Sequence, residues 1–408
     1  MKERIILHCD LNNYFASVES IGHPEYKEVP MAVCGSPKER HGIVLAKNEL
    51  AKKAGIKTAM TVADAKRLCP ELVMVPPHYD KYIAYSKMVQ EVYAKYTDRV
   101  EPFGIDECWL DVTGSTRLFG SGENIANCLR EEMKETFGLT ISVGVSFCKV
   151  MSKLGSDLNK PDGITVITKQ DLQEKVWNLP VGALFGIGRH TVEKLSQLGI
   201  YTIGQLAKVS PQALQGRFGK NGVLWWQCAN GLEYSPVSFY GQQALPKSVS
   251  RSTTCLGDLT NKTQIRRVLL GLTDEVSREL RRFGFLASTV SISLRDDIFS
   301  WSGKQQALAT PTRLVKPILE TAMELVESHW NGNPLRSVGI AATGLIMDKE
   351  PVQTGFFYDV QKMERGERLE NQVDLLKEKM GKGSVCRASE LLCPLQVKLG
   401  SSFGHIQF

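Results

Sequence analysis

Three acidic side chains stand where the sequence could build a site for phosphate chemistry. Asp10 ends an alternating apolar segment that predicts a strand, and Asp106-Glu107 lies at the tip of a predicted hairpin, directly after Gly104. Adjacent residues of a regular strand point to opposite faces, so both acids can serve one site only if the chain bends, which Gly104 makes easier. Three oxygen ligands suit Mg²⁺, and two such ions about 3.5–4 Å apart could hold the attacking and leaving oxygens of a phosphoryl transfer. Spacing alone, however, favours solvated acids at a turn.

The elements that must position these acids form a mixed pattern over residues 1–165, which predicts an α+β domain. Apolar alternation and short apolar runs predict strands at residues 5–10, 29–46, 99–105, 108–113 and 140–146. Helical periodicity predicts helices at residues 14–20, 49–54, 62–68, 79–96 and 123–136.

The remainder of the chain reads as two further domains and a tail. Residues 169–231 show short helical segments punctuated by Gly, Pro and Ser. Residues 248–345 read as a βαββαβ unit, with apolar helix faces at residues 261–283 and 313–330. The first of these helices carries three arginines, Arg278, Arg281 and Arg282. This run is more typical of a solvated helix face than of a surface that reads a DNA groove. The tail is polar and helix-leaning, with no core of its own.

Composition limits the class of protein. With 408 residues, 42% hydrophobic and 23% charged, the chain is typical of soluble globular proteins of two to four domains. No apolar run of about 18 residues predicts a membrane span, and the start lacks the apolar stretch of a signal peptide. Ten cysteines without a Cys-x-x-Cys pair favour a reducing, cytoplasmic location. The net charge of +6 permits an anionic partner without requiring one.

Three motifs, in order along the chain, resemble those of the Y-family DNA polymerases. The matching strings are DLNNYFASVE at residues 10–19, GIDECWLD at 104–111 and SVGVS at 142–146, the last followed by Lys149 and by NKPDG at 159–163. The resemblance implies a right-hand polymerase, with palm at residues 1–20 and 71–165 and fingers at 21–70. It further implies a helical thumb at 166–240, a little finger at 246–346 and a tail at 347–408.

The resemblance also implies roles for single residues. Asp10, Asp106 and Glu107, with the Leu11 carbonyl, match the ligands of two Mg²⁺ ions. The other residues implied to bind the nucleotide are Asn13, Tyr14, Phe15, Lys52 and Lys160. Among them, Tyr14 and Phe15 start a helix whose free N–H groups suit a triphosphate. Phe15 matches the steric gate against a ribose 2′-hydroxyl, and Lys160 matches a lysine that contacts the triphosphate.

The sequence departs from the family pattern in the fingers. Many relatives carry Tyr and Arg where this chain has Glu49 and Lys52, and Asn12 replaces a common second Asp. Lys52 keeps the positive charge but lacks the bidentate fork of arginine. An ionised Glu49 has no hydrogen to donate to a phosphate, so the sequence does not tell which residues of the fingers contact the triphosphate.

DNA contacts are implied in the two later domains. Gly186 and Gly188 lie in a pattern that resembles a helix-hairpin-helix, whose backbone N–H groups suit a DNA phosphate. In the βαββαβ domain the polar strand residues resemble the DNA grip of the little finger. The candidates there are Arg251, Ser291, Ser293 and Arg295.

In the tail, Gln353, Phe356 and Phe357 loosely resemble a peptide that binds a sliding clamp. The front half of the chain resembles polymerase IV, whereas residues 369–392 resemble the tail of the polymerase V and mutagenesis-protein group, so the subgroup stays open.

The resemblance predicts a monomeric, template-directed polymerase that uses primer-template DNA and dNTPs for low-fidelity translesion synthesis. Two alternatives are a catalytically weak accessory protein that binds DNA and a clamp, and a nuclease that uses the same acids.

Overall fold

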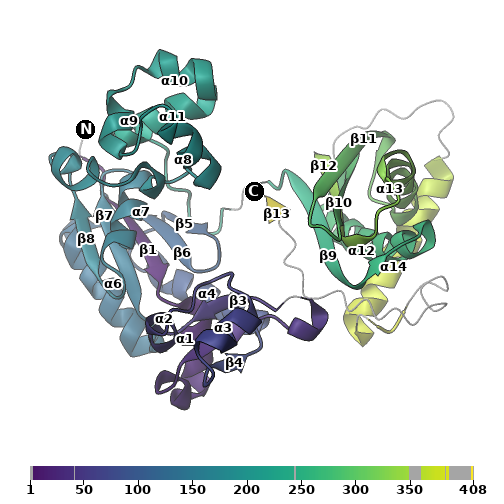
Figure 1. Cartoon of the computed structure of the whole chain (residues 1–408), viewed down its shortest axis with the longest axis horizontal. Helices are drawn as coiled ribbons and strands as arrows, with labels where there is room; N and C mark the ends of the chain where they lie inside the picture. The colour runs from purple at the N-terminus through teal and green to yellow at the C-terminus, as the bar shows by residue number, and fades with distance from the viewer. Residues whose placement is uncertain are drawn as a thin grey trace. The chain divides into compact units, whose positions relative to one another are not determined.

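The computed structural model describes residues 3–40, 42–242, 245–348, 360–381, 383–385 and 406–407. The chain divides into two compact units, Met1–Ser36 with Gly42–Gln242, and Pro37–His41 with Gln243–Phe408 (Figure 1). Among the described residues, no helix is long and apolar enough to cross a membrane.

The first unit is built around a mixed five-stranded sheet with the order β5-β6-β1-β7-β8. Its strands are β1 (Ile6–Leu11), β5 (Val100–Phe103), β6 (Glu107–Asp111), β7 (Ile141–Ser146) and β8 (Ile164–Ile167). The central strand β1 is buried along its whole length and pairs antiparallel with β6 and β7. The acidic residue at the end of β1 is therefore fixed from both sides.

Helices cover both faces of this sheet. Apolar side chains of α4 (Tyr79–Ala94) and α6 (Gly122–Phe137) form one core with Leu7, Cys9 and Leu11. On the other face lies α7 (Lys149–Leu158). A Cβ on Gly144 of β7 would lie 1.8 Å from the Ser152 carbonyl oxygen, so only glycine lets α7 approach the sheet this closely.

A smaller sheet and two short helices follow α1 (Tyr14–Gly22). The sheet has the order β3-β2-β4, formed by β2 (Met31–Cys34), β3 (Val44–Lys47) and β4 (Val73–Val75). Asn48 caps α2 (Glu49–Lys53) and Thr61 caps α3 (Val62–Leu68), each by accepting a backbone N–H.

The end of the first unit is helical, as predicted. It contains α8 (Arg189–Ser196), α9 (Ile203–Lys208), α10 (Pro211–Phe218) and α11 (Lys220–Ala229). Their buried side chains, including Leu195, Leu206 and Trp225, form one core with apolar residues of α7.

The second unit has the predicted βαββαβ order. Its elements are β9 (Ser248–Leu259), α12 (Lys262–Phe283), β10 (Phe285–Asp296), β11 (Trp301–Thr312), α13 (Val315–His329) and β12 (Leu335–Met347). The antiparallel sheet has the order β11-β10-β12-β9-β13, with β13 (Ile406–Gln407) paired to β9. The two helices form the core with one face of the sheet, whose side chains include Val290, Ile292 and Ile340.

The opposite face of this sheet is polar, and we call it the open face. Ladder pairs place its side chains together, because Ser291 lies opposite Ala341 and Ala341 lies opposite Ser250. The open face includes the side chains of Ser250, Ser252, Ser291, Ser293, Arg295 and Trp301.

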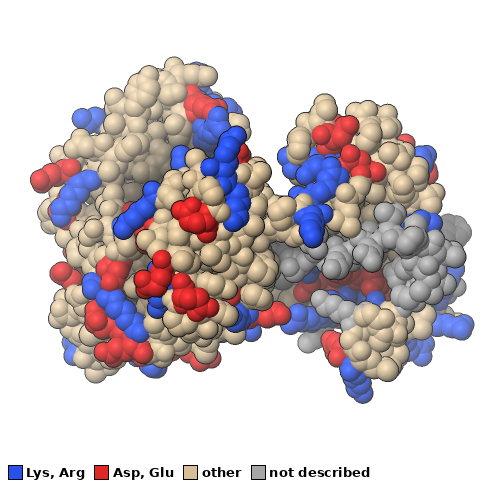
Figure 2. All heavy atoms as spheres, turned by 60° about the horizontal axis from the view of Figure 1, so that its bottom comes forward, with Lys and Arg blue, Asp and Glu red and all other residues tan. Residues whose placement is uncertain are grey.

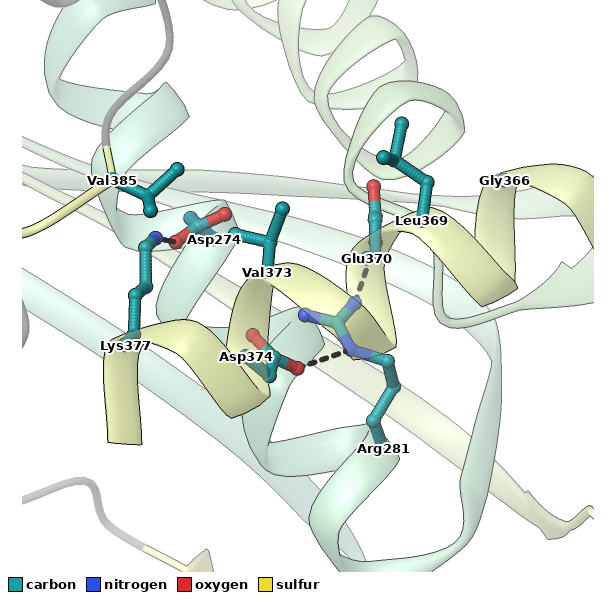
Figure 3. Close-up of a pocket in the computed structure, with 9 residues that line it drawn as sticks. All are labelled: Asp274, Arg281, Gly366, Leu369, Glu370, Val373, Asp374, Lys377 and Val385. Atoms are coloured by element: carbon teal, nitrogen blue, oxygen red, sulfur yellow. Dashed lines mark hydrogen bonds and ion pairs between the residues drawn. The ribbon is translucent and has the colours of Figure 1, made fainter. Parts of the chain in front are cut away.

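The tail contributes α14 (Val360–Met380), which packs on the second unit through ion pairs. Arg281 of α12 lies between Glu370 and Asp374, with nitrogen–oxygen distances of 2.5 and 2.6 Å (Figure 3). Lys377 pairs with Asp274 at 2.6 Å. Because only 4% of the Arg281 side chain is exposed, its expected place on a solvated helix face was wrong.

Candidate active site

The bend predicted at Gly104 is present and brings the acids together. Gly104 has φ +79°, and the Leu11 N–H donates to the Asp106 carbonyl at 3.0 Å. Asp10 lies directly opposite Glu107 in the β1–β6 ladder, so the two side chains share a face. The structure thus gathers the three predicted carboxylates at one end of β1 and β6.

Two lysines neutralise two of the three acids. Lys160 Nζ lies 2.7 Å from Asp10 Oδ2 and 2.7 Å from Asp157 Oδ1. Lys153 of α7 pairs with Glu107. Among the residues that the structure describes, no lysine or arginine forms an ion pair with Asp106.

A buried histidine that was not expected from the sequence forms a hydrogen bond with Glu107. His8 is fully buried, with Nε2 3.1 Å from Glu107 Oε2 and Nδ1 2.8 Å from Ser156 Oγ. An ionised carboxylate only accepts, so Nε2 carries the proton toward Glu107. The Ser156 hydroxyl donates to the Lys153 carbonyl at 2.8 Å. The signal available in the sequence was the strand period, which places His8 on the same face as Asp10.

The electrostatics of the three acids differ. Burial, followed by the charges of Asp10 and Glu107, raises the pKa of Asp106 to about 6. Burial also raises the pKa of Asp10, although the neighbouring Lys160 acts in the opposite direction. For Glu107, burial is outweighed by hydrogen bonds from His8 and Lys153, which lower its pKa to about 2. The acids repel one another, which adds to the effect of burial on the pKa of Asp10 and of Asp106.

Asn12, where relatives often have a second Asp, joins two parts of the site. Its Nδ2 donates to Ser142 Oγ at 2.9 Å, and its Oδ1 accepts from the Asp162 N–H at 2.8 Å. An aspartate has no N–H to donate to Ser142. Asn12 therefore fixes the turn that carries Lys160.

The start of α1 lies immediately after these acids. Asn13 adopts a left-handed conformation (φ 50°) as N-cap, and Tyr14 and Phe15 form the first turn. The Phe15 ring stacks on Tyr82 of α4, with 4.2 Å between centroids and planes 11° apart. Tyr82 in turn donates to the buried Glu19 at 2.5 Å, so the half-buried Phe15 ring rests on a fixed support.

Of the two unusual residues of the predicted fingers, Glu49 contacts this helix start and Lys52 pairs with Glu49. Glu49 Oε1 accepts from Asn13 Nδ2 at 2.9 Å and lies 3.5 Å from Lys52 Nζ. Lys52 is therefore linked to Asn13 through the carboxylate of Glu49, an acid that the family pattern does not have at this position.

No group of three His, Cys, Asp or Glu side chains in the described ranges is close enough to hold a metal ion as it stands. The hydrogen bonds account for this, because Asp10 is turned to Lys160 and Glu107 to Lys153 and His8. The chemistry of the donor set nevertheless fits a hard divalent cation, since all three side chains offer oxygen and, within the described part of the chain, Asp106 forms no ion pair with a lysine or arginine.

The predicted DNA contacts fall in separate places. Gly186 has φ +85°, and Gly188 caps the N-terminus of α8. Ser291, Ser293 and Arg295 share the open face of the second unit. Figure 2 shows basic and acidic side chains interspersed on the side of the molecule that it draws.

Arg251 was assigned to the wrong face. It lies opposite Ile340, on the helix-covered side of the sheet. Its guanidinium pairs with Glu279 and, at 3.3 Å, with Glu275 of α12. Its charge is therefore used within the domain. The predicted clamp peptide, Gln353, Phe356 and Phe357, lies outside the described residues.

Comparisons with known proteins give the family context. Residues 9–157 match the impB/mucB/samB family, and residues 246–356 match the C-terminal domain of that family. Residues 182–232 match a domain described as DNA polymerase-iota, thumb domain.

Curated relatives match over nearly the whole chain and carry the name DNA polymerase IV. The protein from Acetivibrio thermocellus is 44% identical over 94% of this chain and 97% of its own length. Those from Moorella thermoacetica and Bacillus velezensis are 39% and 36% identical, over 95% and 99% of this chain and 96% and 97% of their own lengths. Between the two subgroups left open by the sequence, these names favour polymerase IV.

A solved structure shares the fold. The Y-family DNA polymerase chimera Dbh-Dpo4(243-245)-Dbh aligns with a TM-score of 0.75 at 23% identity, covering 84% of this chain and 99% of the chimera. Together these matches confirm the expected fold class, α+β with a thumb-like helical domain and a C-terminal sheet domain like a little finger.

Proposed function

The chain belongs to the Y family of DNA polymerases, and on that premise we propose that it extends primers by two-metal nucleotidyl transfer at Asp10, Asp106 and Glu107. We further propose the low fidelity of translesion synthesis, with primer-template DNA and dNTPs as substrates. Mg²⁺ is the proposed metal.

The observation that supports this most is the convergence of three carboxylates whose charges are incompletely balanced. Lys160 and Lys153 neutralise Asp10 and Glu107, while burial and then the negative charges of Asp10 and Glu107 raise the pKa of Asp106. Such a cluster favours added positive charge. When bound, divalent cations lower the pKa of an attacking hydroxyl and stabilise charge that develops on phosphate oxygens.

The residues around the acids have separate proposed roles. His8 and Ser156 orient the Glu107 carboxylate, as outer partners of metal ligands commonly do. The Leu11 carbonyl is a further proposed ligand. Lys160, held near Asp10, transfers its hydrogen bonds to the triphosphate when dNTP binds.

The start of α1 supplies the remaining nucleotide contacts. Free N–H groups of Tyr14 and Phe15 favour phosphate oxygens through the helix dipole. The Phe15 ring excludes a ribose 2′-hydroxyl, and its stack on Tyr82 keeps it from moving aside.

The domain roles follow the family. Residues 1–20 and 71–165 form the palm, 21–70 the fingers, 166–240 the thumb and 246–346 the little finger. Gly186 and Gly188 of the thumb, and Ser291, Ser293 and Arg295 of the open face, hold DNA phosphates without reading sequence. The chain acts as a monomer, and residues 353–357 bind a sliding clamp.

One assay tests the polymerase against both alternatives. The full chain is incubated with a labelled primer-template, dNTPs and Mg²⁺. Primer extension supports the proposal, whereas shortening of the primer supports a nuclease. Binding of the primer-template with neither reaction supports an accessory protein. Repeating the assay opposite an abasic template position tests translesion synthesis.

A further inference from the structure

A cluster of arginines and aromatic rings lies at the β10–β11 turn, at one end of the open face. Arg295 lies opposite Trp301 in the ladder, and its guanidinium carbon is 5.2 Å from the Trp301 ring centroid. The same carbon is 4.8 Å from the Phe299 centroid, and that of Arg336 is 5.0 Å from it. Two cations and two rings thus form one contiguous surface.

Both rings are exposed although the turn that carries them is well fixed. Phe299 is 54% exposed and Trp301 is 56% exposed. The Asp296 N–H donates to the Ser300 carbonyl at 3.1 Å, and the Ser300 N–H donates to Asp296 Oδ1 at 2.7 Å. Phe299 has φ 68°, an unfavourable conformation for a bulky residue. Such backbone strain is concentrated at functional positions.

A third arginine, Arg40, lies in the same unit, but its Nη1 is 2.7 Å from Asp258 Oδ1, so this carboxylate offsets its charge. Burial and then the charge of Arg40 lower the pKa of Arg336, and Arg295 acts in the same direction. Arg295 and Arg336, which lie over the same Phe299 ring, are well placed to bind phosphate, because guanidinium groups hold phosphate through paired hydrogen bonds.

The rings differ in what they can offer a ligand. Phe299 already receives two guanidinium groups, so it serves to position them. Trp301 receives Arg295 and keeps more than half of its surface accessible. An exposed indole beside arginines is the combination with which proteins stack single-stranded nucleic acid bases.

We propose that Trp301, Arg295 and Arg336 form a contact site for the unpaired part of the template strand, with Trp301 stacking on a base and the arginines binding phosphates. Bases inside a duplex have both faces covered by neighbours, so an exposed ring on this surface selects an unpaired base. The proposal rests on the proposed function, which supplies a template with a single-stranded overhang.

The test compares two primer-templates with the full chain and without dNTPs. One has a 5′ template overhang of about 12 nucleotides and the other of about two, since single-stranded sites commonly cover 4–16 nucleotides. Trp301→Leu should weaken binding of the long overhang by about 5- to 30-fold and that of the short one by less than about twofold, measured by fluorescence anisotropy. Phe283→Leu is the matched control, because this ring also carries an arginine, Arg282, at 5.5 Å. That control should bind both DNAs like the wild type.

A second variant tests the arginines independently. Arg336→Gln should reduce the slope of log affinity against log salt concentration by about one for the long overhang, because one phosphate contact is lost. An unchanged slope would contradict this role.

Equal losses on both overhangs, or no loss with Trp301→Leu, would overturn the stacking site. Failure of the wild type to extend the primer once dNTPs are added would instead refute the polymerase assignment. The binding comparison contains no dNTP, so the two failures are distinguishable.

Discussion

Asn13 donates a hydrogen bond to Glu49 at 2.9 Å, which ties the first residue before α1 to the first turn of α2. The contact places a carboxylate beside the helix start that we propose to face the triphosphate. Lys52 lies 3.5 Å from the same carboxylate and offsets part of its charge. An acid at this position should weaken the binding of dNTPs.

Removing that charge is therefore expected to improve nucleotide binding. Glu49→Gln keeps an oxygen that can accept from Asn13, but no longer repels the triphosphate. We predict a KM for dNTP about two- to fivefold lower, with kcat little changed, because a unit charge near 4 Å contributes about 1 kcal/mol in water. Steady-state primer extension over a dNTP series measures this. Glu28→Gln, at an exposed position of the same region, is the control, and an increased KM in Glu49→Gln would contradict the repulsion.

The stack of Phe15 on Tyr82 makes a specific prediction about sugar selectivity. Phe15→Ala removes the ring proposed to exclude a 2′-hydroxyl, so the preference for dNTP over rNTP should fall by at least about tenfold. Single-nucleotide incorporation of matched dNTP and rNTP measures the ratio. Phe15→Tyr keeps the ring and should keep the preference. Unchanged selectivity in a folded Phe15→Ala protein would exclude Phe15 as the gate.

The hydrogen bond from Tyr82 to the Glu19 carboxylate makes the stability of the protein depend on pH. Burial of Glu19 is outweighed by hydrogen bonds from Tyr82 and His78, and its pKa is lowered. The unfolded state therefore takes up the proton first as pH falls. The stability that Glu19 contributes is present above its unfolded pKa, about 4.3, and is lost as pH falls toward the folded value.

Glu19→Gln should thus be destabilised by about 2 kcal/mol at neutral pH, the scale of hydrogen bonds to a charged group. The difference from the wild type should narrow below about pH 4.3. Thermal unfolding at a series of pH values measures this, with the exposed Glu91→Gln as control. A difference that widened in acid would have the wrong sign for the proposed linkage.

The ion pairs of α14 predict an asymmetry between two kinds of variant. The double variant Glu370→Gln, Asp374→Asn leaves the buried Arg281 without counter-charges. This should lower the free energy of unfolding of the second unit by about 3–5 kcal/mol. Adding Arg281→Met to these two substitutions removes all three charges together and should cost clearly less. Denaturant unfolding of the wild type, the double variant and the triple variant compares them. A larger loss in the triple variant would show that α14 depends on the arginine for packing rather than for charge.

Much of the fold follows from sequence periodicity. The strands β1, β5, β6 and β7 and the helices α12 and α13 were expected within a few residues, because half-buried elements separate apolar from polar side chains. The edge strand β8 was not expected. Helix α7 was not expected, since it approaches the sheet through glycine and serine around Gly144 rather than through an apolar stripe. Docking of α14 was not expected either, because ion pairs leave no periodic signal.

The three acids of the candidate site could be predicted from the sequence, but the residues that form hydrogen bonds and ion pairs with Glu107 could not. Asp10, Asp106 and Glu107 came from motif order, and the structure brings them together. His8 and Lys153 depend on how α7 packs, which no local pattern encodes. Arg251 was misassigned because Ser250 and Arg251 are both polar, so alternation does not tell which of them faces the helices.

The most direct test of the account is primer extension by Asp106→Asn. This isosteric change removes one proposed metal ligand while the fold of β5 and β6 is retained. We predict that extension falls at least about a thousandfold, because metal stabilisation of the transition state contributes several kcal/mol, while primer-template affinity stays within about twofold. Asp98→Asn, an exposed acid of the same unit, should extend normally. Extension by Asp106→Asn at a rate near that of the wild type would contradict a carboxylate-based polymerase site.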